Sequence, residues 1–394
     1  MNKIKLSLRK KIIKTSFYLI AILLLNLVKL PVKPLLDNTI SNPFVLFLDS
    51  ITGGAFTGLA ISCLGIIPFA NAGMIVSLLA TIVPKLQNLR YEGNYGSRKI
   101  KLLTNIIGTL ITIAMSTVLV SYLSLNGILY NNLLISKIGI VCLISVGTFI
   151  VNALCNKISE INLVNGASAI IACNISQYLL LSIINDFKML LSNLSVSSNI
   201  LIILRFLILI LVFLIANCLL NIENKIPAHI VAKDRNKNNS TEFAINFVGS
   251  ITTAIIFVNM LLIIPKLFYI SYAVPWINML IILNTSILCY KISLSTIYNT
   301  EAIAKELTIS SIYLDGINQG EQTKKFLDKY LVKNSIQAGI VTAIVIIVSN
   351  YCSGLLLLDL QGVFILVAVI KGLLFSYKSN KAVESYKGFL SEIK

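Results

Sequence analysis

The sequence predicts an all-α polytopic membrane protein. Hydrophobic residues make up 56% of the 394 residues, and charged residues make up only 12%. A soluble chain of this size would carry about twice that charged fraction. Apolar stretches of roughly 20 residues, the length of a helix that crosses a bilayer, recur from one end of the chain to the other. The polar stretches between them are too short to form a soluble domain.

Ten apolar stretches are predicted to be transmembrane helices. The first follows the basic segment MNKIKLSLRKKIIK, and we interpret it as a retained span because no small-residue cleavage site follows it. The predicted spans are Ile12–Leu30, Ser62–Val83, Leu102–Leu125, Ile135–Cys155, Ala167–Ile184, Ile200–Leu220, Phe243–Pro265, Trp276–Tyr298, Ile336–Leu355 and Gly362–Tyr377.

The basic residues predict how the spans are oriented. With the amino terminus inside, the inner segments hold about 24 Lys and Arg residues, and the outer loops hold about three. This bias places both termini in the cytoplasm. Because the net charge of +17 is spread over short loops, it does not predict nucleic-acid binding.

The chain divides into two halves with five predicted spans each. The amino-terminal half covers residues 1–184, an external hinge covers 185–199, and the carboxy-terminal half covers 200–394. Halves with an odd number of spans have opposite topologies, which fits an inverted repeat. Two inner loops, residues 221–242 and 299–333, are longer and more polar than the rest, and we expect them to meet partners in the cytoplasm.

One segment indicates a pore or a transport path. From Gly53 the chain reads GGAFTGLAISCLGIIPF, a short apolar segment flanked by glycines that precedes a helix of membrane length. A half-helix that enters the bilayer and stops is tolerated only where it lines a cavity within the protein. The segment therefore bears on function as well as on fold.

Catalysis is not predicted. The single histidine, His229, lies in a loop, and the seven cysteines fall in or beside apolar segments without a Cys-x-x-Cys pair. The sequence contains no metal-ligand cluster, phosphate loop or nucleophile motif. We therefore expect no enzymatic activity and no catalytic, cofactor or metal site.

A few polar residues lie within apolar sequence. Arg205 and Lys371 either extend toward the membrane interface or face an aqueous cavity. Asn71 and Asn246 are the asparagines that we place at a helix–helix seam that opens. Carboxylates are almost absent from the spans, which argues against a secondary transporter of a small solute, because ion coupling uses intramembrane carboxylates. A structural scaffold would need neither the half-helix nor the projecting basic loops.

The order of the segments resembles the SecY family, the channel subunits of the bacterial protein translocase. The resemblance extends from about Ser16 to Leu390 and rests on motifs that are individually weak but are specific in their number and order. They are GGAFTGLAISCLGIIPF for the plug and second span, IVPKLQNLRYEGNYGSRKI for the loop that follows, ISEINLVNGAS for the entry to span five, STEFAINFVGSI for the entry to span seven, and DGINQGEQTKKFLDK for the loop after span eight.

The resemblance implies a central pore with a ring of apolar residues at its waist and a short helix that plugs it. The ring positions are Ile66, Ala70, Ala167, Ile171, Ile365 and, in span seven, Ile251 or Ile255. The plug covers residues 49–59, with Asp49, Ile51, Gly53, Gly54, Phe56 and Leu59. A lateral gate for apolar segments falls between spans two and seven, where Asn71 and Asn246 lie.

The resemblance also implies partners and a location. A small SecE-like subunit would clamp the halves, and a SecA-type motor ATPase or a ribosome would deliver secretory preproteins. The sequence does not decide whether a SecG-like third subunit is present. The location would be the bacterial cytoplasmic membrane, with lipid around the spans. The predicted docking residues are Arg98, Lys99, Lys233, Arg235, Asn318, Lys324 and Lys325.

Two departures from the family pattern favour a divergent, accessory copy over the housekeeping channel. The ring is usually bulky where this chain has Ala70 and Ala167. The loop after span eight usually carries Arg-Pro where this chain has Asn318 and Gln319. Loss of a fixed cation weakens or redirects the docking of a partner. We therefore expect a restricted set of exported proteins.

Overall fold

The computed structural model describes residues 8–33, 43–83, 85–86, 89, 92–125, 127–130, 133–161, 163, 165–192, 196–221, 223–230, 240–246, 254–256, 258–259, 279–288, 300–309, 312–314, 316–356 and 359–374. The chain forms two compact units. The first comprises Met1–Val76, Asn88–Phe213 and Asn350–Lys394, and the second comprises Ser77–Gln87 and Leu214–Ser349. The division does not follow the predicted boundary at 185–199, because the end of the chain clusters with its beginning. The inverted repeat stays a prediction.

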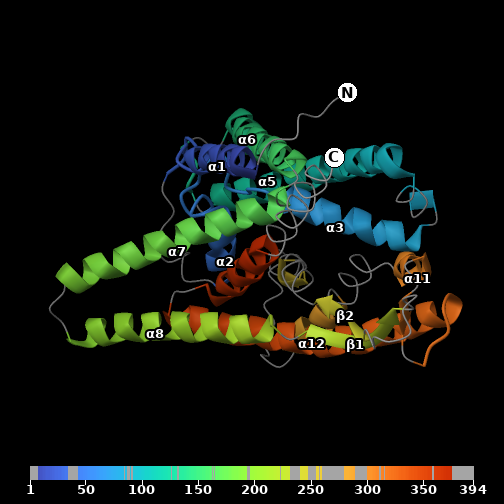
Figure 1. Cartoon of the computed structure of the whole chain (residues 1–394). Helices are drawn as coiled ribbons and strands as arrows, with labels where there is room; N and C mark the ends of the chain where they lie inside the picture. The colour runs from blue at the N-terminus through green and yellow to red at the C-terminus, as the bar shows by residue number, and fades with distance from the viewer. Residues whose placement is uncertain are drawn as a thin grey trace. The chain divides into compact units, whose positions relative to one another are not determined.

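Helices build most of the first unit (Figure 1). They are α1 (Leu8–Leu25), α2 (Pro43–Thr52), the start of α3 (Ile67–Ile82), α5 (Gly93–Leu125), α6 (Leu134–Glu160), α7 (Gly166–Ser192) and most of α8 (Val196–Leu219). Helix α1 packs against α6 and α7, α6 packs against α5 and α7, and α2 packs against α7. Small residues bring the backbones close together, as is usual between membrane helices. A Cβ atom at Gly108 of α5 would overlap the ring of Phe69 on α3.

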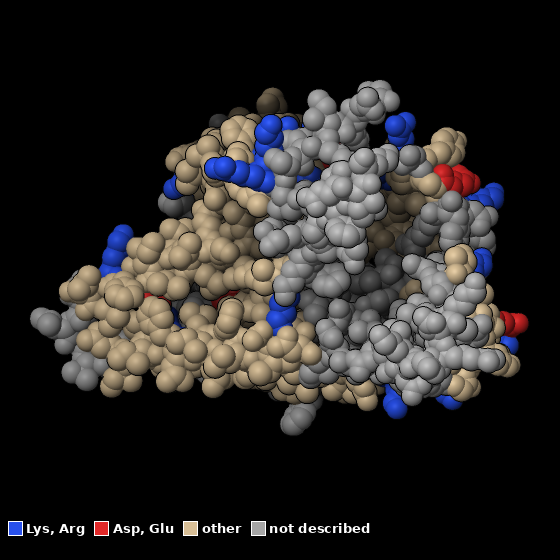
Figure 2. All heavy atoms as spheres, viewed as in Figure 1, with Lys and Arg blue, Asp and Glu red and all other residues tan. Residues whose placement is uncertain are grey.

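Five helices in the described part of the chain are long and apolar enough to cross a membrane. They are Tyr95–Leu125, Leu134–Glu160, Gly166–Lys188, Ile202–Leu219 and Glu321–Cys352. Shorter apolar helices, Ile67–Ser77, Met279–Leu288 and Leu360–Leu374, fall in three more of the ten predicted spans. Figure 2 shows that uncharged side chains cover the region of α7 and α8, as a lipid-facing surface requires. A helical, multi-pass membrane protein is thus confirmed.

Three helix starts differ from the starts of the predicted spans, because the end of a helix does not follow hydropathy. Helix α5 begins at Gly93 rather than Leu102, and α12 (Glu321–Leu356) begins at Glu321 rather than Ile336. Hydropathy marks where the lipid ends, whereas a helix continues into water when its residues favour it, as the Lys- and Glu-containing first turns of α12 do. Conversely, α3 begins at Ile67 rather than Ser62, because residues 53–66 form successive turns.

The predicted external hinge is largely helical. Helix α7 continues to Ser192 and α8 begins at Val196, so most of residues 185–199 belongs to one helix or the other. The two helices form a hairpin, in which Phe206 and Arg205 of α8 contact Phe187 and Asp186 of α7.

The predicted cytoplasmic loops contribute the strands of one sheet in the second unit. Strand β1 (Glu223–Ile230) lies at the centre, with β2 (Ser240–Asn246) on one side and β3 (Ile312–Leu314) on the other. Both pairings are antiparallel, with His229 opposite Ser240 in β2 and opposite Tyr313 in β3. Helix α11 (Thr300–Ile309) packs against β3. The predicted seventh span, Phe243–Pro265, therefore begins too early, because Phe243–Asn246 belongs to β2.

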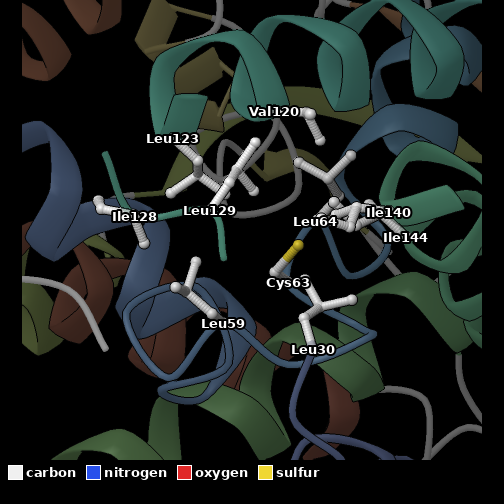
Figure 3. Packing of buried hydrophobic residues seen from close by; sticks show 10 residues of the cluster. All are labelled: Leu30, Leu59, Cys63, Leu64, Val120, Leu123, Ile128, Leu129, Ile140 and Ile144. Atoms are coloured by element: carbon white, nitrogen blue, oxygen red, sulfur yellow. The ribbon is translucent and has the colours of Figure 1, made fainter. Parts of the chain in front are cut away.

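An apolar cluster in the first unit holds the chain that returns from α2. Figure 3 shows Leu59, Cys63 and Leu64 of the return segment against side chains of α5, α6 and the α5–α6 connection. The segment also pairs with the chain after α1: the Leu30 N–H donates to the Leu59 carbonyl at 2.7 Å, and the Ile61 N–H donates to the Val28 carbonyl at 2.8 Å. The return segment is thus fixed on one side by apolar contacts and on the other by backbone hydrogen bonds.

Candidate functional site

The predicted plug forms a helix that ends in a tight turn. Helix α2 stops at Thr52, and Gly53 follows with φ +70°, a conformation that glycine adopts without strain. The Gly54 N–H donates to the Asp49 carbonyl at 2.9 Å, and the Gly53 N–H donates to the Ser50 carbonyl at 3.2 Å. This is the Schellman motif, which closes a helix with a left-handed glycine.

The next two carbonyls of α2 are satisfied by asparagines from elsewhere in the chain. Asn174 on α7 donates its side-chain N–H to the Ile51 carbonyl at 2.9 Å. Asn26, which follows α1, donates to the Thr52 carbonyl at 3.1 Å and also accepts from the Ser62 hydroxyl at 2.8 Å. The last four carbonyls of a helix lack partners within it, so these contacts complete the termination of α2.

Asp49 clasps the turn that follows α2. Its Oδ1 atom accepts the backbone N–H of Thr57 at 2.8 Å, and its Oδ2 atom accepts the Thr57 hydroxyl at 2.8 Å. The Asp49 residue is only 5% exposed. A buried carboxylate requires such donors, because an unpaired one is costly to desolvate. The clasp therefore holds residues 49–57, which we call the α2 turn, in one compact shape.

Ser50 joins the α2 turn to the last described helix. Its hydroxyl donates to Oδ2 of Asp359, and both residues are almost fully buried. Asp359 also caps the helix Leu360–Leu374, since its carboxylate accepts the N–H groups of Gln361 at 3.1 Å and Gly362 at 3.0 Å. We call the side chains that hold the α2 turn from outside it, together with Ser50, the polar anchor: Asn26, Ser50, Asn174 and Asp359.

The predicted ring residues fall on three elements of the first unit and one segment of the second. Ile66, Ile171 and Ile365 are buried, whereas Ala70 and Ala167 are half-buried. Ile66 precedes α3, and its carbonyl accepts the Ala70 N–H at 3.0 Å, so the expected one-turn relation between them holds. In the second unit Ile255 is buried, and Ile251 lies outside the described residues.

The two predicted gate asparagines differ from each other. Asn71 is fully buried on α3, and neither its side-chain oxygen nor its nitrogen has a hydrogen-bond partner among the described residues. Asn246 is the last residue of β2, paired in register with Glu223. The expectation that Asn246 lies within a span is therefore wrong, since the chain is still a strand at that point.

Arg205 is paired in the structure. Its Nη1 atom lies 2.9 Å from Oδ1 of Asp186 on α7, and the two side chains are 16% and 9% exposed. The sequence leaves open whether Arg205 extends toward the membrane interface or faces a water-filled cavity. Pairing with a buried carboxylate is a third arrangement, which the sequence does not indicate. Lys371, the other basic residue in apolar sequence, lies on the helix Leu360–Leu374.

The comparison with protein-family models identifies the chain. The SecY family model matches residues 60–374, which is most of the sequence. The chain belongs to the SecY family. The resemblance to this family that the sequence motifs indicate is thus confirmed.

Individual relatives are distant or matched only in part. The chloroplastic SECY preprotein translocase subunit of Spinacia oleracea is 37% identical over 145 residues, which is 36% of this chain and 26% of that protein. The SecY translocase subunit of Buchnera aphidicola is 22% identical over 334 residues, 77% of this chain and 74% of that protein. A solved protein-conducting channel has a TM-score of 0.73 at 15% identity, covering 94% of this chain and 92% of that one, which shows a shared fold. The match to the first of these relatives spans about a quarter of its length.

Several predicted docking residues of this SecY-family chain lie on helices rather than in loops. Arg98 and Lys99 are exposed in the first turns of α5, with the Lys99 Nζ atom 4.5 Å from the centre of the Tyr95 ring. Lys324 and Lys325 are in the first turns of α12, where Lys325 pairs with Glu321 at 2.9 Å. Asn318 is exposed just before α12, and Lys233 and Arg235 lie outside the described residues.

Sequence reasoning misses most of the polar anchor. An asparagine in an apolar span, such as Asn174, generally bonds between helices, but no pattern in the sequence singles out Asn26, Ser50 or Asp359. A local signal exists for Asp359, because an aspartate directly before an apolar helical run is typical of an amino-terminal cap. The pairing of Ser50 with a residue 309 positions away has no local signal.

Proposed function

We propose that this chain is the pore-forming subunit of a protein-export translocase in the bacterial cytoplasmic membrane. It conducts unfolded secretory polypeptides across the membrane and releases apolar segments sideways into the lipid. The observation that supports this most is the combination of the SecY family match over residues 60–374 with the buried, fully capped α2 turn. The chain does no covalent chemistry in this proposal, and a partner supplies the energy.

In this function the α2 turn is the plug and the apolar residues form the constriction. The ring comprises Ile66, Ala70, Ala167, Ile171, Ile251 or Ile255, and Ile365. An apolar constriction excludes ions because water leaves it, and it offers a passing polypeptide no polar group on which to stall. Leu59 packs in the apolar cluster that holds the return segment, so in this proposal the movable part of the plug ends before Leu59.

The buried side-chain amide of Asn71 supports the proposal that α3 forms part of the lateral gate. A buried amide without a partner costs about 1–3 kcal/mol. A seam that opens next to Asn71 exposes the amide to water or to the backbone of a passing segment, and part of that cost is recovered. The closed state is thereby made less stable relative to the open state, as a gate requires.

The partners are a SecE-like clamp, a SecG-like subunit where one is present, and a SecA-type motor or a ribosome. The three-stranded sheet and the start of α12 form the docking face in the cytoplasm, because the two predicted partner loops supply its strands. Both termini lie on that side, and the halves move about the α7–α8 hairpin. The missing arginine at Asn318 supports a restricted set of clients.

A secondary transporter is not favoured. Ion coupling needs carboxylates that are free to bind and release a cation in the membrane. Among the described residues, the three buried aspartates all have partners: Asp49 binds Thr57, Asp186 binds Arg205, and Asp359 binds Ser50 and a helix amino terminus.

A stalled secretory chain tests the proposal. Photo-crosslinking residues are placed at Phe56 in the plug and at Ile66, Ile171 and Ile365 in the ring, one at a time. Lipid-facing Ile203 on α8, which is 61% exposed, is the matched control. We expect crosslinks from the plug and ring positions and none from Ile203. A chain that is trapped in the complex and crosslinks to none of the plug and ring positions refutes the pore assignment.

A further inference from the structure

We infer that Asp359 is a positioning residue that ties the seated plug to the amino terminus of the helix Leu360–Leu374. The inference rests on the proposed function only in giving the α2 turn the role of a plug. The same carboxylate caps that helix and accepts the Ser50 hydroxyl of α2. The helix carries the ring residue Ile365, so a single side chain joins the plug to one wall of the constriction.

The contact is built for close approach. Gly362 lies against the carboxylate: a Cβ atom there would be 2.5 Å from Oδ2 of Asp359 and 3.1 Å from Oγ of Ser50. Any side chain at that position would therefore push Ser50 away from Asp359. Ser50 and Asp359 are 1% and 3% exposed, so the hydrogen bond is made without competing water. A hydrogen bond to a carboxylate is about twice as strong as one between neutral groups.

The link also breaks without leaving an unpaired group. The Ser50 hydroxyl lies 2.9 Å from the Phe47 carbonyl of its own helix, an alternative acceptor that stays with α2 when the plug moves. Asp359 keeps both bonds to the helix amino terminus. Because a serine hydroxyl has only one proton, it donates to one acceptor at a time. Release of the plug thus exchanges a stronger bond for a weaker one, which makes the link reversible.

The other members of the polar anchor differ in this respect. Asn174 and Asn26 donate to the Ile51 and Thr52 carbonyls, which are terminal groups of α2 without a partner in their own helix. When the plug leaves, those carbonyls need water. The Ser50–Asp359 link is therefore the part of the anchor whose loss changes the position of the plug with the least effect on the folding of α2.

The test measures how often the plug leaves its seat. A cysteine replaces Phe56, which is half-buried in the α2 turn. The rate at which a water-soluble maleimide labels it is measured in resting membranes without substrate or motor, and labelled sites are identified by mass spectrometry. Ser50→Ala removes the donor, and Asp359→Ser removes the acceptor while keeping a good helix cap. Ser145→Ala on α6 is the control, because it removes a buried serine hydroxyl that donates to the Val141 carbonyl of its own helix.

We expect Ser50→Ala and Asp359→Ser each to speed labelling at position 56 about tenfold, which corresponds to about 1.4 kcal/mol. The double variant should be no faster than either single variant, because both remove the same contact. Ser145→Ala should stay within about twofold of the parent.

The inference is overturned if Ser50→Ala is labelled at the parental rate, if the two single effects multiply in the double variant, or if Ser145→Ala is labelled as fast as Ser50→Ala. The result is separable from that of the crosslinking experiment. If Ser50→Ala is labelled at the parental rate but the plug and ring positions crosslink to the secretory chain, the Asp359 link is refuted and the pore function is supported. If labelling of Ser50→Ala is fast but no position crosslinks, the Asp359 link is supported and the pore function is refuted.

Discussion

Replacing Arg205 by alanine is expected to destabilise the α7–α8 hairpin by about 3 kcal/mol. The Arg205 guanidinium and the Asp186 carboxylate are 2.9 Å apart, and their side chains are 16% and 9% exposed. Removing one member of a buried pair costs about 3–5 kcal/mol, because the other charge is left without a partner. We take the lower end, since Nε of Arg205 already lacks a hydrogen bond among the described residues, so the pair is not ideally satisfied.

The double variant separates the cost of an orphaned charge from the value of the pair. Replacing Arg205 by methionine and Asp186 by leucine removes both charges, and such exchanges are often neutral or stabilising. Polar pairs between membrane helices contribute on average only about 0.6 kcal/mol. We therefore expect the double variant to lie within about 1 kcal/mol of the parent, although the single variant is strongly destabilised.

Reversible unfolding in mixed micelles, followed by circular dichroism, measures both variants. Arg98→Ala is the control, because Arg98 is an exposed arginine in the same unit. A single variant as stable as the parent means that the pair is solvated in the membrane. A double variant that is no more stable than Arg205→Ala means that the hairpin depends on the charges themselves. Either result refutes the reasoning.

Three further predictions follow from named contacts. Gly147→Ala places a methyl group against the Ile61 carbonyl and should cost about 1–3 kcal/mol in the same unfolding assay, whereas Gly139→Ala on the same helix meets open space and should be neutral or stabilising. Ile365→Asn buries an unpaired amide at 0% exposure and should raise the ion leak of resting vesicles about 5- to 150-fold; an unchanged leak would remove Ile365 from the ring. Asn318→Arg should strengthen binding of a housekeeping motor to vesicles by about 0.2–1 kcal/mol, and equal binding would count against a specialised partner.

The spanning helices are predictable because hydropathy reports the solvent of each segment directly. A run such as Leu134–Glu160 has to be helical in lipid, whatever the rest of the chain does. Hydropathy does not predict where a helix ends once the chain has left the lipid. For that reason α5 and α12 extend well beyond their predicted starts, with Arg98, Lys99, Lys324 and Lys325 carried on helical turns.

The sheet and the polar anchor cannot be predicted from local sequence patterns, because both depend on contacts between residues that are far apart in the chain. Strand β1 pairs with β3 across more than 80 residues, so neither strand is stabilised by its own neighbours in sequence. Ser50 meets Asp359 because two helix ends are brought together by packing, and no spacing in the sequence encodes that meeting. The α2 turn can be located in the sequence from its glycines, whereas the side chains that hold it can be found only from the fold.

In the proposed role of the α2 turn as a plug, its contacts account for a segment that is both held in place and able to move. Its return segment is fixed by apolar packing at Leu59 and Cys63, and the carboxy-terminal turn of α2 makes hydrogen bonds with Asn26, Asn174 and Asp359. A hydrogen bond that is exchanged for one with water contributes only about 0.5–1.5 kcal/mol net. The same groups left unpaired in a dry environment cost several kcal/mol each. In the proposed function, these contacts would keep the plug seated while the constriction is dry and would release it more easily once water enters, so wetting of the pore and release of the plug would favour each other.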